Sequence, residues 1–154
     1  MGETIENRLA ALGVALPAAA APAGSYLPFM RSGDLLFTAG QLPLKDGKLL
    51  FAGLAGRDVD VEKGREAAKL CAINVLAQVK AALGDLEKMR RLVKITVFVA
   101  SAPDFTEQHL VANGASDFLA EALGDRGRHV RAAVGTTSLP LNAAVEVEAI
   151  FEVG

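Results

Sequence analysis

The fold is decided by residues 128–153, which read RHVRAAVGTTSLPLNAAVEVEAIFEV. Two strand-like runs flank residues 139–142, where proline and asparagine interrupt strand pairing. Because side chains alternate along a strand, the second run has apolar residues on one face and three acids on the other: Glu146, Glu148 and Glu152. The pattern predicts a half-buried strand with an acidic face.

The first run carries an arginine among small residues. Arg131, Ala133 and Gly135 share one face of the predicted strand, which leaves room beside the guanidinium. Together with the acid Glu146, this arrangement has the elements of a pocket. Two other interpretations stay open, because Arg131 also fits a structural ion pair with an acid on a neighbouring strand or subunit, and Glu146 fits an acidic, solvent-facing strand.

Composition limits the classes of function. The chain has 154 residues, 51% hydrophobic and 22% charged, which predicts one globular domain with its own core. A net charge of −2 gives no electrostatic case for nucleic acid or an anionic membrane as a partner. With one cysteine, Cys71, and two histidines, we expect no internal disulfide, no zinc site and a cytoplasmic location.

The N-terminal segment is apolar but broken. Residues 9–30 carry no charge and have the length of a membrane span, yet three prolines and two glycines interrupt them. The residues before them are too acidic for a signal peptide. We therefore expect a short helix near residues 4–12 followed by an arm, with residues 1–19 as an N-terminal extension and residues 20–154 as the domain.

The rest of the chain alternates strand and helix signals. Strands are predicted at 27–31, 34–42 and 48–52, with Asp46-Gly47 as a hairpin turn, and again at 92–100. Helices are predicted from Asp60, a plausible N-cap, to Gly84, and from Pro103 to Gly124, where Asp104 and Glu107 have the spacing of a capping box. The order βββαβαββ predicts an α+β fold with a mixed six-stranded sheet and two helices on one face.

The second face of the predicted sheet is also apolar and is expected to pack against another surface. Residues 35–37 and 97–99 are apolar on both faces, so both faces of the sheet are expected to be buried. The simplest cover is a second copy of the chain in a symmetric homo-oligomer. Clefts between subunits would then be the natural ligand sites.

Four segments occur in the order found in a known family. They are APAGSY at 21–26, FTAGQLP at 37–43, ITVFV at 95–99, and 131–150, which begins with arginine and ends in VEVEAI. On these segments, residues 20–153 resemble the reactive-intermediate deaminase family, the YjgF-like or Rid (RidA) proteins, also labelled endoribonuclease L-PSP. The resemblance implies a chorismate-mutase-like fold and a homotrimer with ligand sites between subunits.

The same resemblance implies an activity and a set of site residues. Family members hydrolyse reactive enamine and imine acids, such as 2-aminoacrylate, to 2-oxo acids and ammonia, without a metal or organic cofactor. The arginine that clamps the substrate carboxylate falls on Arg131 and the catalytic glutamate on Glu146. Substrate-binding positions fall on Tyr26, Ala39, Gly40, Asn113 and Ala133.

Two of these positions depart from the family pattern. The best-known deaminases have serine where this chain has Ala39, and often cysteine where it has Ala133. The expected pocket is therefore more apolar. Two functions stay open: a deaminase, favoured because both Arg131 and Glu146 are kept, and a non-catalytic module that binds a small carboxylate or another metabolite in the same cleft.

Overall fold

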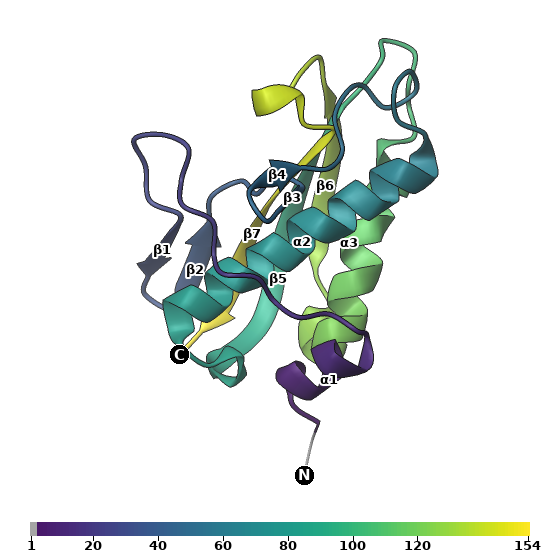
Figure 1. The fold of residues 1–154 in the computed structure, drawn as a ribbon. Helices are drawn as coiled ribbons and strands as arrows, with labels where there is room; N and C mark the ends of the chain where they lie inside the picture. Colours follow the sequence, from purple (N-terminus) through teal and green to yellow (C-terminus); the bar gives the residue numbers. More distant parts are fainter. Residues whose placement is uncertain (1–2) are drawn as a thin grey trace.

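The computed structural model describes residues 3–154 as one sheet with a helical layer on one face (Figure 1). The five-stranded sheet has the order β1-β2-β7-β5-β6. Only β5 and β6 are parallel. The strands are β1 Phe29–Ser32, β2 Leu35–Thr38, β5 Met89–Ala100, β6 Val130–Thr136 and β7 Val145–Val153. The α+β class with a mixed sheet is thus as the sequence predicts.

The sheet has five strands rather than six because the third predicted strand pairs elsewhere. It is reduced to β4 (Lys48–Leu49), which forms a separate hairpin with β3 (Leu44–Lys45). Asp46 and Gly47 both have positive φ, so the two-residue turn pairs β4 with its immediate predecessor. After it, Ala52 makes only an isolated bridge to Ala143, and Gly53, with φ 104°, turns the chain away.

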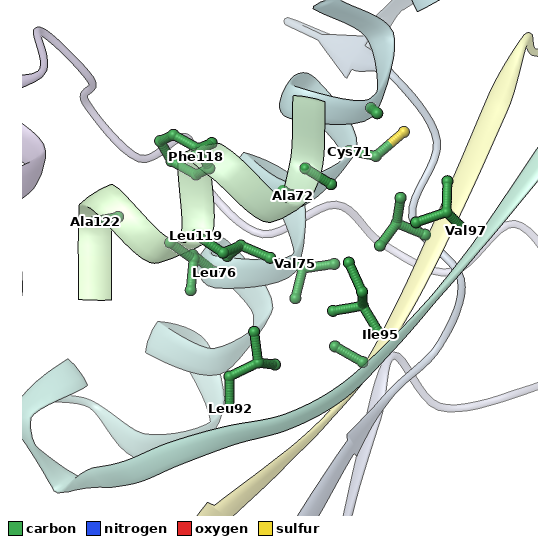
Figure 2. Close-up of a cluster of buried hydrophobic side chains, with 14 of the residues drawn as sticks. Cys71, Ala72, Val75, Leu76, Leu92, Ile95, Val97, Phe118, Leu119 and Ala122 are labelled. Atoms are coloured by element: carbon green, nitrogen blue, oxygen red, sulfur yellow. The ribbon is translucent and has the colours of Figure 1, made fainter. Parts of the chain in front are cut away.

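Two long helices cover one face of the sheet. Helix α2 (Val61–Leu83) begins where the Asp60 carboxylate accepts the Lys63 backbone N–H at 2.8 Å, and it ends at Gly84 in a positive-φ conformation. Helix α3 runs over Gln108–Leu123 and packs against α2. Figure 2 shows the core between them and β5, whose members include Cys71, Val75, Leu76, Ile95, Val97, Phe118 and Leu119. Cys71 is a core residue.

Helix α3 starts five residues later than the sequence predicts. Residues 102–105 instead form a turn, in which the Phe105 N–H donates to the Ala102 carbonyl and the Phe105 side chain packs against Gly56. The expected cap from Asp104 is absent, and Glu107 takes the N-cap position without a side-chain hydrogen bond. Packing of the phenylalanine thus overrides the local capping signal.

The N-terminal segment packs on the helical layer. Helix α1 (Ile5–Ala11) is capped by Thr4 and buries Ile5 and Leu9 completely, at 0% and 1% exposed. The arm that follows runs across α2 (Figure 1), and the Ala20 carbonyl accepts a 2.8 Å hydrogen bond from the Gln78 side chain. Residues 1 and 2 of the expected extension lie outside the described residues.

The opposite face of the sheet is open and apolar. Met30, Leu35, Phe37 and Val134 are exposed large hydrophobic residues on the strands. By the strand registers, Phe37, Ile150, Phe98 and Val134 point away from the helices, together with the glutamates of β7. None of the helices among residues 3–154 is long and apolar enough to cross a membrane.

Gly114 permits the closest approach of the two long helices. A side chain there would collide with the backbone carbonyl of Arg65 on α2, which cannot move without shifting that helix. We predict that Gly114→Ala lowers the free energy of unfolding by about 2 kcal/mol through overpacking, measured by urea denaturation.

Gly64→Ala is the matched control for this substitution. Its added methyl would meet side-chain atoms of Val111 at 2.9 and 3.2 Å rather than the backbone of the facing helix, so a smaller loss is expected. Equal stability of the Gly114 variant and the native protein would contradict this account of helix packing.

Candidate active site

The expected site residues form two groups, and the first surrounds Arg131. The Arg131 side chain crosses from β6 to α3, where Nη1 donates to Asn113 Oδ1 at 2.8 Å and to Ser116 Oγ at 3.0 Å. Nη2 donates to the backbone carbonyl of His109 at 2.9 Å. Ala133, two residues further along β6, shares this face and is partly buried. The structure thus brings together Arg131, Asn113 and Ala133.

Ser116 also belongs to this group, although it was not among the residues expected from the sequence. Asn113 and Ser116 lie three residues apart on α3, a spacing that puts both on one side of a helix, so the Asn113 assignment could have led to Ser116. The His129 ring continues the network, with Nε2 2.9 Å from Ser116 Oγ and Nδ1 2.6 Å from the Gly127 carbonyl. Because a carbonyl only accepts, Nδ1 carries a proton. His129 holds Ser116 in place.

The second group surrounds Glu146 on β7. The Glu146 carboxylate lies directly against the Cα of Gly40, where any side chain would collide with it. Gly40 is positioned by its neighbour Gln41, which exchanges two backbone hydrogen bonds with Val147, at 2.7 and 3.0 Å. The absence of a side chain at position 40 therefore makes room for the acid.

Tyr26, Ala39 and Gly40 line a small cavity of about 50 Å³. Its outer wall is the arm at residues 20–23, and Gln41 and Gln78 also face it. Tyr26 is 51% exposed, and its hydroxyl accepts a hydrogen bond from the Ala23 N–H at 3.3 Å. The arm and the 39–41 segment thus meet at this cavity, and Gly40 of that segment also contacts the Glu146 carboxylate.

The environment of Glu146 favours its protonated form. Burial raises the pKa of the Glu146 carboxyl above its ordinary value, and repulsion from the Glu148 carboxylate raises this pKa further. A carboxyl with a raised pKa can hold a proton closer to neutral pH and exchange it with a bound molecule. Burial also raises the pKa of the Cys71 thiol well above its usual value, so this thiol stays protonated in the core.

Within one chain the two groups do not meet. Arg131 is in register with Ile95 on β5, and Ile95 is in register with Ala149 on β7. Glu146 lies three residues from Ala149, so it points to the opposite face from Arg131, with about 14 Å between the two Cα atoms by strand spacing and rise. The pocket expected between Arg131 and Glu146 is therefore absent from a single chain.

Two further observations describe the surroundings of these groups. No carboxylate among residues 3–154 forms an ion pair with Arg131, so the alternative of an internal structural salt bridge is wrong. In the same part of the chain, no three His, Cys, Asp or Glu side chains lie close enough together to hold a metal ion.

Known proteins match this chain in sequence and in fold. A family model described as "YjgF/chorismate_mutase-like, putative endoribonuclease" matches residues 6–153. Protein TCP17 of Trypanosoma cruzi is 49% identical over 149 residues, 96% of this chain and 93% of that protein. The crystal structure of Atu1372 from Agrobacterium tumefaciens, a protein of unknown function, matches with a TM-score of 0.92 and 58% identity over 97% of this chain and 92% of that one.

A more distant structure adds a bound ligand. E. coli TdcF, crystallised with bound serine, matches with a TM-score of 0.64 and 27% identity, over 89% of this chain and 94% of that one. The match to the family model covers nearly the whole chain and includes both site groups. The family and the fold expected from the sequence are thereby confirmed: the chain belongs to the YjgF/chorismate-mutase-like family.

Proposed function

We propose that this protein is an enamine/imine deaminase that hydrolyses small 2-imino acids to 2-oxo acids and ammonia. The proposal rests on the hydrogen bonds of the Arg131 guanidinium, which leave two of its N–H groups free within residues 3–154. Arginine has five N–H donors, and three of its hydrogen bonds here hold it against α3. Among the described residues, Nε–H and one Nη2–H have no acceptor, and in this proposal these free donors bind the substrate carboxylate.

The proposed reaction adds water across the imine bond. 2-Aminoacrylate, once tautomerised to 2-iminopropanoate, takes up one water at its imine carbon and loses one ammonia to give pyruvate. The imine carbon is already electrophilic, so the protein needs only to position the acid and move protons. Glu146, with its raised pKa, is the group proposed to donate to the leaving nitrogen and to accept from water.

The site is proposed to lie between copies of the chain. Arg131 and Glu146 face opposite sides of one sheet, so one substrate can contact both only if they come from different subunits. The open apolar sheet face supplies the surface for such an assembly, a homotrimer in this proposal. The serine bound to E. coli TdcF, a small molecule with a carboxylate, agrees with the proposed size and charge of the substrate.

A second candidate is a non-catalytic module that binds a small carboxylate in the same cleft. Ala39 favours it, because this residue brings a methyl group to the cavity wall where the best-known deaminases have a hydroxyl. Arg131 would then hold the ligand in the same way, and no turnover would follow.

An assay of ammonia release separates these two functions. With freshly generated 2-aminoacrylate, the native protein should accelerate ammonia release, and Arg131→Ala should lower kcat/KM by about 100-fold because the substrate loses its orientation. Arg131→Lys should not restore the rate, since an ammonium lacks the planar fork. Arg128→Ala, on a nearby exposed arginine, is the matched control and should keep native activity. If the native protein does not accelerate ammonia release, the deaminase is excluded and the non-catalytic binding module remains.

Substitution of Glu148 tests the electrostatic environment of the proton-carrying acid, Glu146. Glu148→Gln removes a negative charge beside Glu146, so the pKa of the Glu146 carboxyl should fall, yet it should stay above its ordinary value because burial is unchanged. Carbon-13 NMR titration of the Glu146 carboxyl measures this. Glu152→Gln, six residues away on the same strand face, should leave the titration unchanged. An unchanged or higher pKa in the Glu148 variant would contradict the electrostatic account.

A further inference from the structure

His129 is a titratable residue beside the candidate site that the proposed reaction does not use. It lies just before β6, two residues from Arg131, and it is partly buried. Its Nδ1 is 2.6 Å from the Gly127 carbonyl and its Nε2 is 2.9 Å from Ser116 Oγ. Because the carbonyl only accepts, Nδ1 carries the proton, and Nε2 of the neutral ring is an acceptor. The neutral ring therefore accepts the proton of the Ser116 hydroxyl.

The Ser116 hydroxyl joins this histidine to the arginine. Its single proton points to His129 Nε2, which leaves its lone pairs for the Arg131 Nη1–H at 3.0 Å. Asn113 Oδ1 accepts the other proton of Nη1 at 2.8 Å. The donors thus run in one direction, from the guanidinium through the hydroxyl to the imidazole, and such bonds strengthen one another. This order requires the neutral form of His129.

Protonation of His129 would reverse one of these bonds. A protonated ring has an N–H on both nitrogens, so Nε2 would donate to Ser116 Oγ, and this oxygen would then face two cationic donors. The bonds of 2.9 and 3.0 Å place the new charge at most 5.9 Å from Arg131 Nη1. Like charges at this separation repel each other. The hydrogen bond that holds Nη1 on Ser116 is therefore weaker when the ring is protonated.

The charged groups around the ring do not offset this new charge. Arg91 of β5 and Arg128 line the same surface cavity as His129. No Asp or Glu among residues 3–154 forms an ion pair with His129, and Asp125 in the preceding turn is exposed to solvent. Two acids on neighbouring elements are already paired with arginines: Asp117 with Arg65 at 3.4 Å and Glu87 with Arg126 at 3.1 Å. Protonation adds a charge to a group of cations.

We propose that a proton on His129 controls how firmly Arg131 binds a carboxylate. The neutral ring positions the guanidinium through Ser116, and protonation weakens this anchoring, so His129 is a positioning residue that the substrate does not touch. The inference rests on the proposed function, in which Arg131 binds the substrate carboxylate. Carboxylate affinity should then be highest when the ring is neutral and should fall as the pH decreases from about 8 to about 5, the range in which imidazoles ordinarily titrate.

A direct attraction between the protonated ring and the carboxylate would have the opposite effect. The carboxylate would lie beyond the guanidinium, farther from the ring than Nη1 is, at a separation comparable with the Debye length of about 8 Å in physiological salt. Screening makes this attraction the smaller effect. The sign of the pH dependence therefore distinguishes positioning through Ser116 from a simple effect of charge.

Binding of pyruvate at two pH values tests the inference. Pyruvate, the proposed product, stays ionised between pH 8 and pH 5.5, and NMR titration gives its Kd without turnover. From pH 8 to pH 5.5 the Kd of the native protein should rise about fivefold more than that of His129→Gln, which keeps an acceptor near Nε2 but does not titrate. Ser116→Ala should remove the same pH dependence and should weaken binding at pH 8. Glu146 titrates in all three proteins, so only their difference counts.

The state of the ring can be measured independently. Nitrogen-15 NMR of His129 in the native protein at pH 8 should show the proton on Nδ1, and a proton on Nε2 would overturn the inference. Equal pH dependence in the native protein and His129→Gln would also overturn it, as would tighter native binding at the lower pH. If Ser116→Ala keeps the native pH dependence, the hydroxyl does not join the two residues, and the inference again fails.

The outcomes also separate this inference from the proposed function. Binding of pyruvate with the expected pH dependence but without ammonia release would keep the role of His129 and remove the deaminase. Ammonia release together with equal pH dependence in the native protein and His129→Gln would do the reverse. If pyruvate does not bind at either pH, this inference and carboxylate binding by Arg131 both fail.

Discussion

The structure depends on the pairing of β7 in the middle of the sheet, between β2 and β5. Strand alternation there gives β7 two different faces: Val145, Val147 and Phe151 enter the core under α2 and α3, while Glu146 and Glu148 point to the open side. A shift of one residue would reverse both faces, so the buried apolar set fixes the register. The position of the catalytic candidate Glu146 is thus a consequence of core packing.

The same alternation separates the two halves of the site. On β6 it directs Arg131 toward α3, where three hydrogen bonds hold the guanidinium, and on β7 it directs Glu146 to the opposite face beside Gly40. Each half is formed within a single chain, but a substrate cannot contact both halves of that chain. Under the proposed assembly through the open apolar face, the two halves would come together from different chains, and the exposed face and the divided site would then have one explanation.

Much of this could be predicted from sequence because it follows from short-range patterns. Side-chain alternation predicted the strands within residues 128–153. The Asp60 cap and Gly84 predicted the two ends of α2, and Asp46-Gly47 predicted the hairpin of β3 and β4. What could not be predicted depends on distant packing. The β3–β4 hairpin leaves the main sheet because its turn satisfies β4 locally, and α3 starts late because Phe105 is anchored on Gly56.

The same contrast between local sequence patterns and distant packing holds for the candidate site. Its residue types could be identified from motifs, whereas their partners come from remote segments: Ser116 on α3 for Arg131, and Gly40 for Glu146. No sequence pattern states that a serine in a helix joins His129 to Arg131. That information exists only when α3 and the start of β6 are placed together in three dimensions.

The most direct test of the divided site is complementation between two inactive variants. Arg131→Ala and Glu146→Gln chains, each inactive alone, would be unfolded together, refolded as a mixture and assayed for ammonia release. If each site takes Arg131 from one chain and Glu146 from another, random assembly of an equal mixture should restore about a quarter of native activity. A mixture no more active than the separate variants would show that both residues act within one chain, contrary to this account.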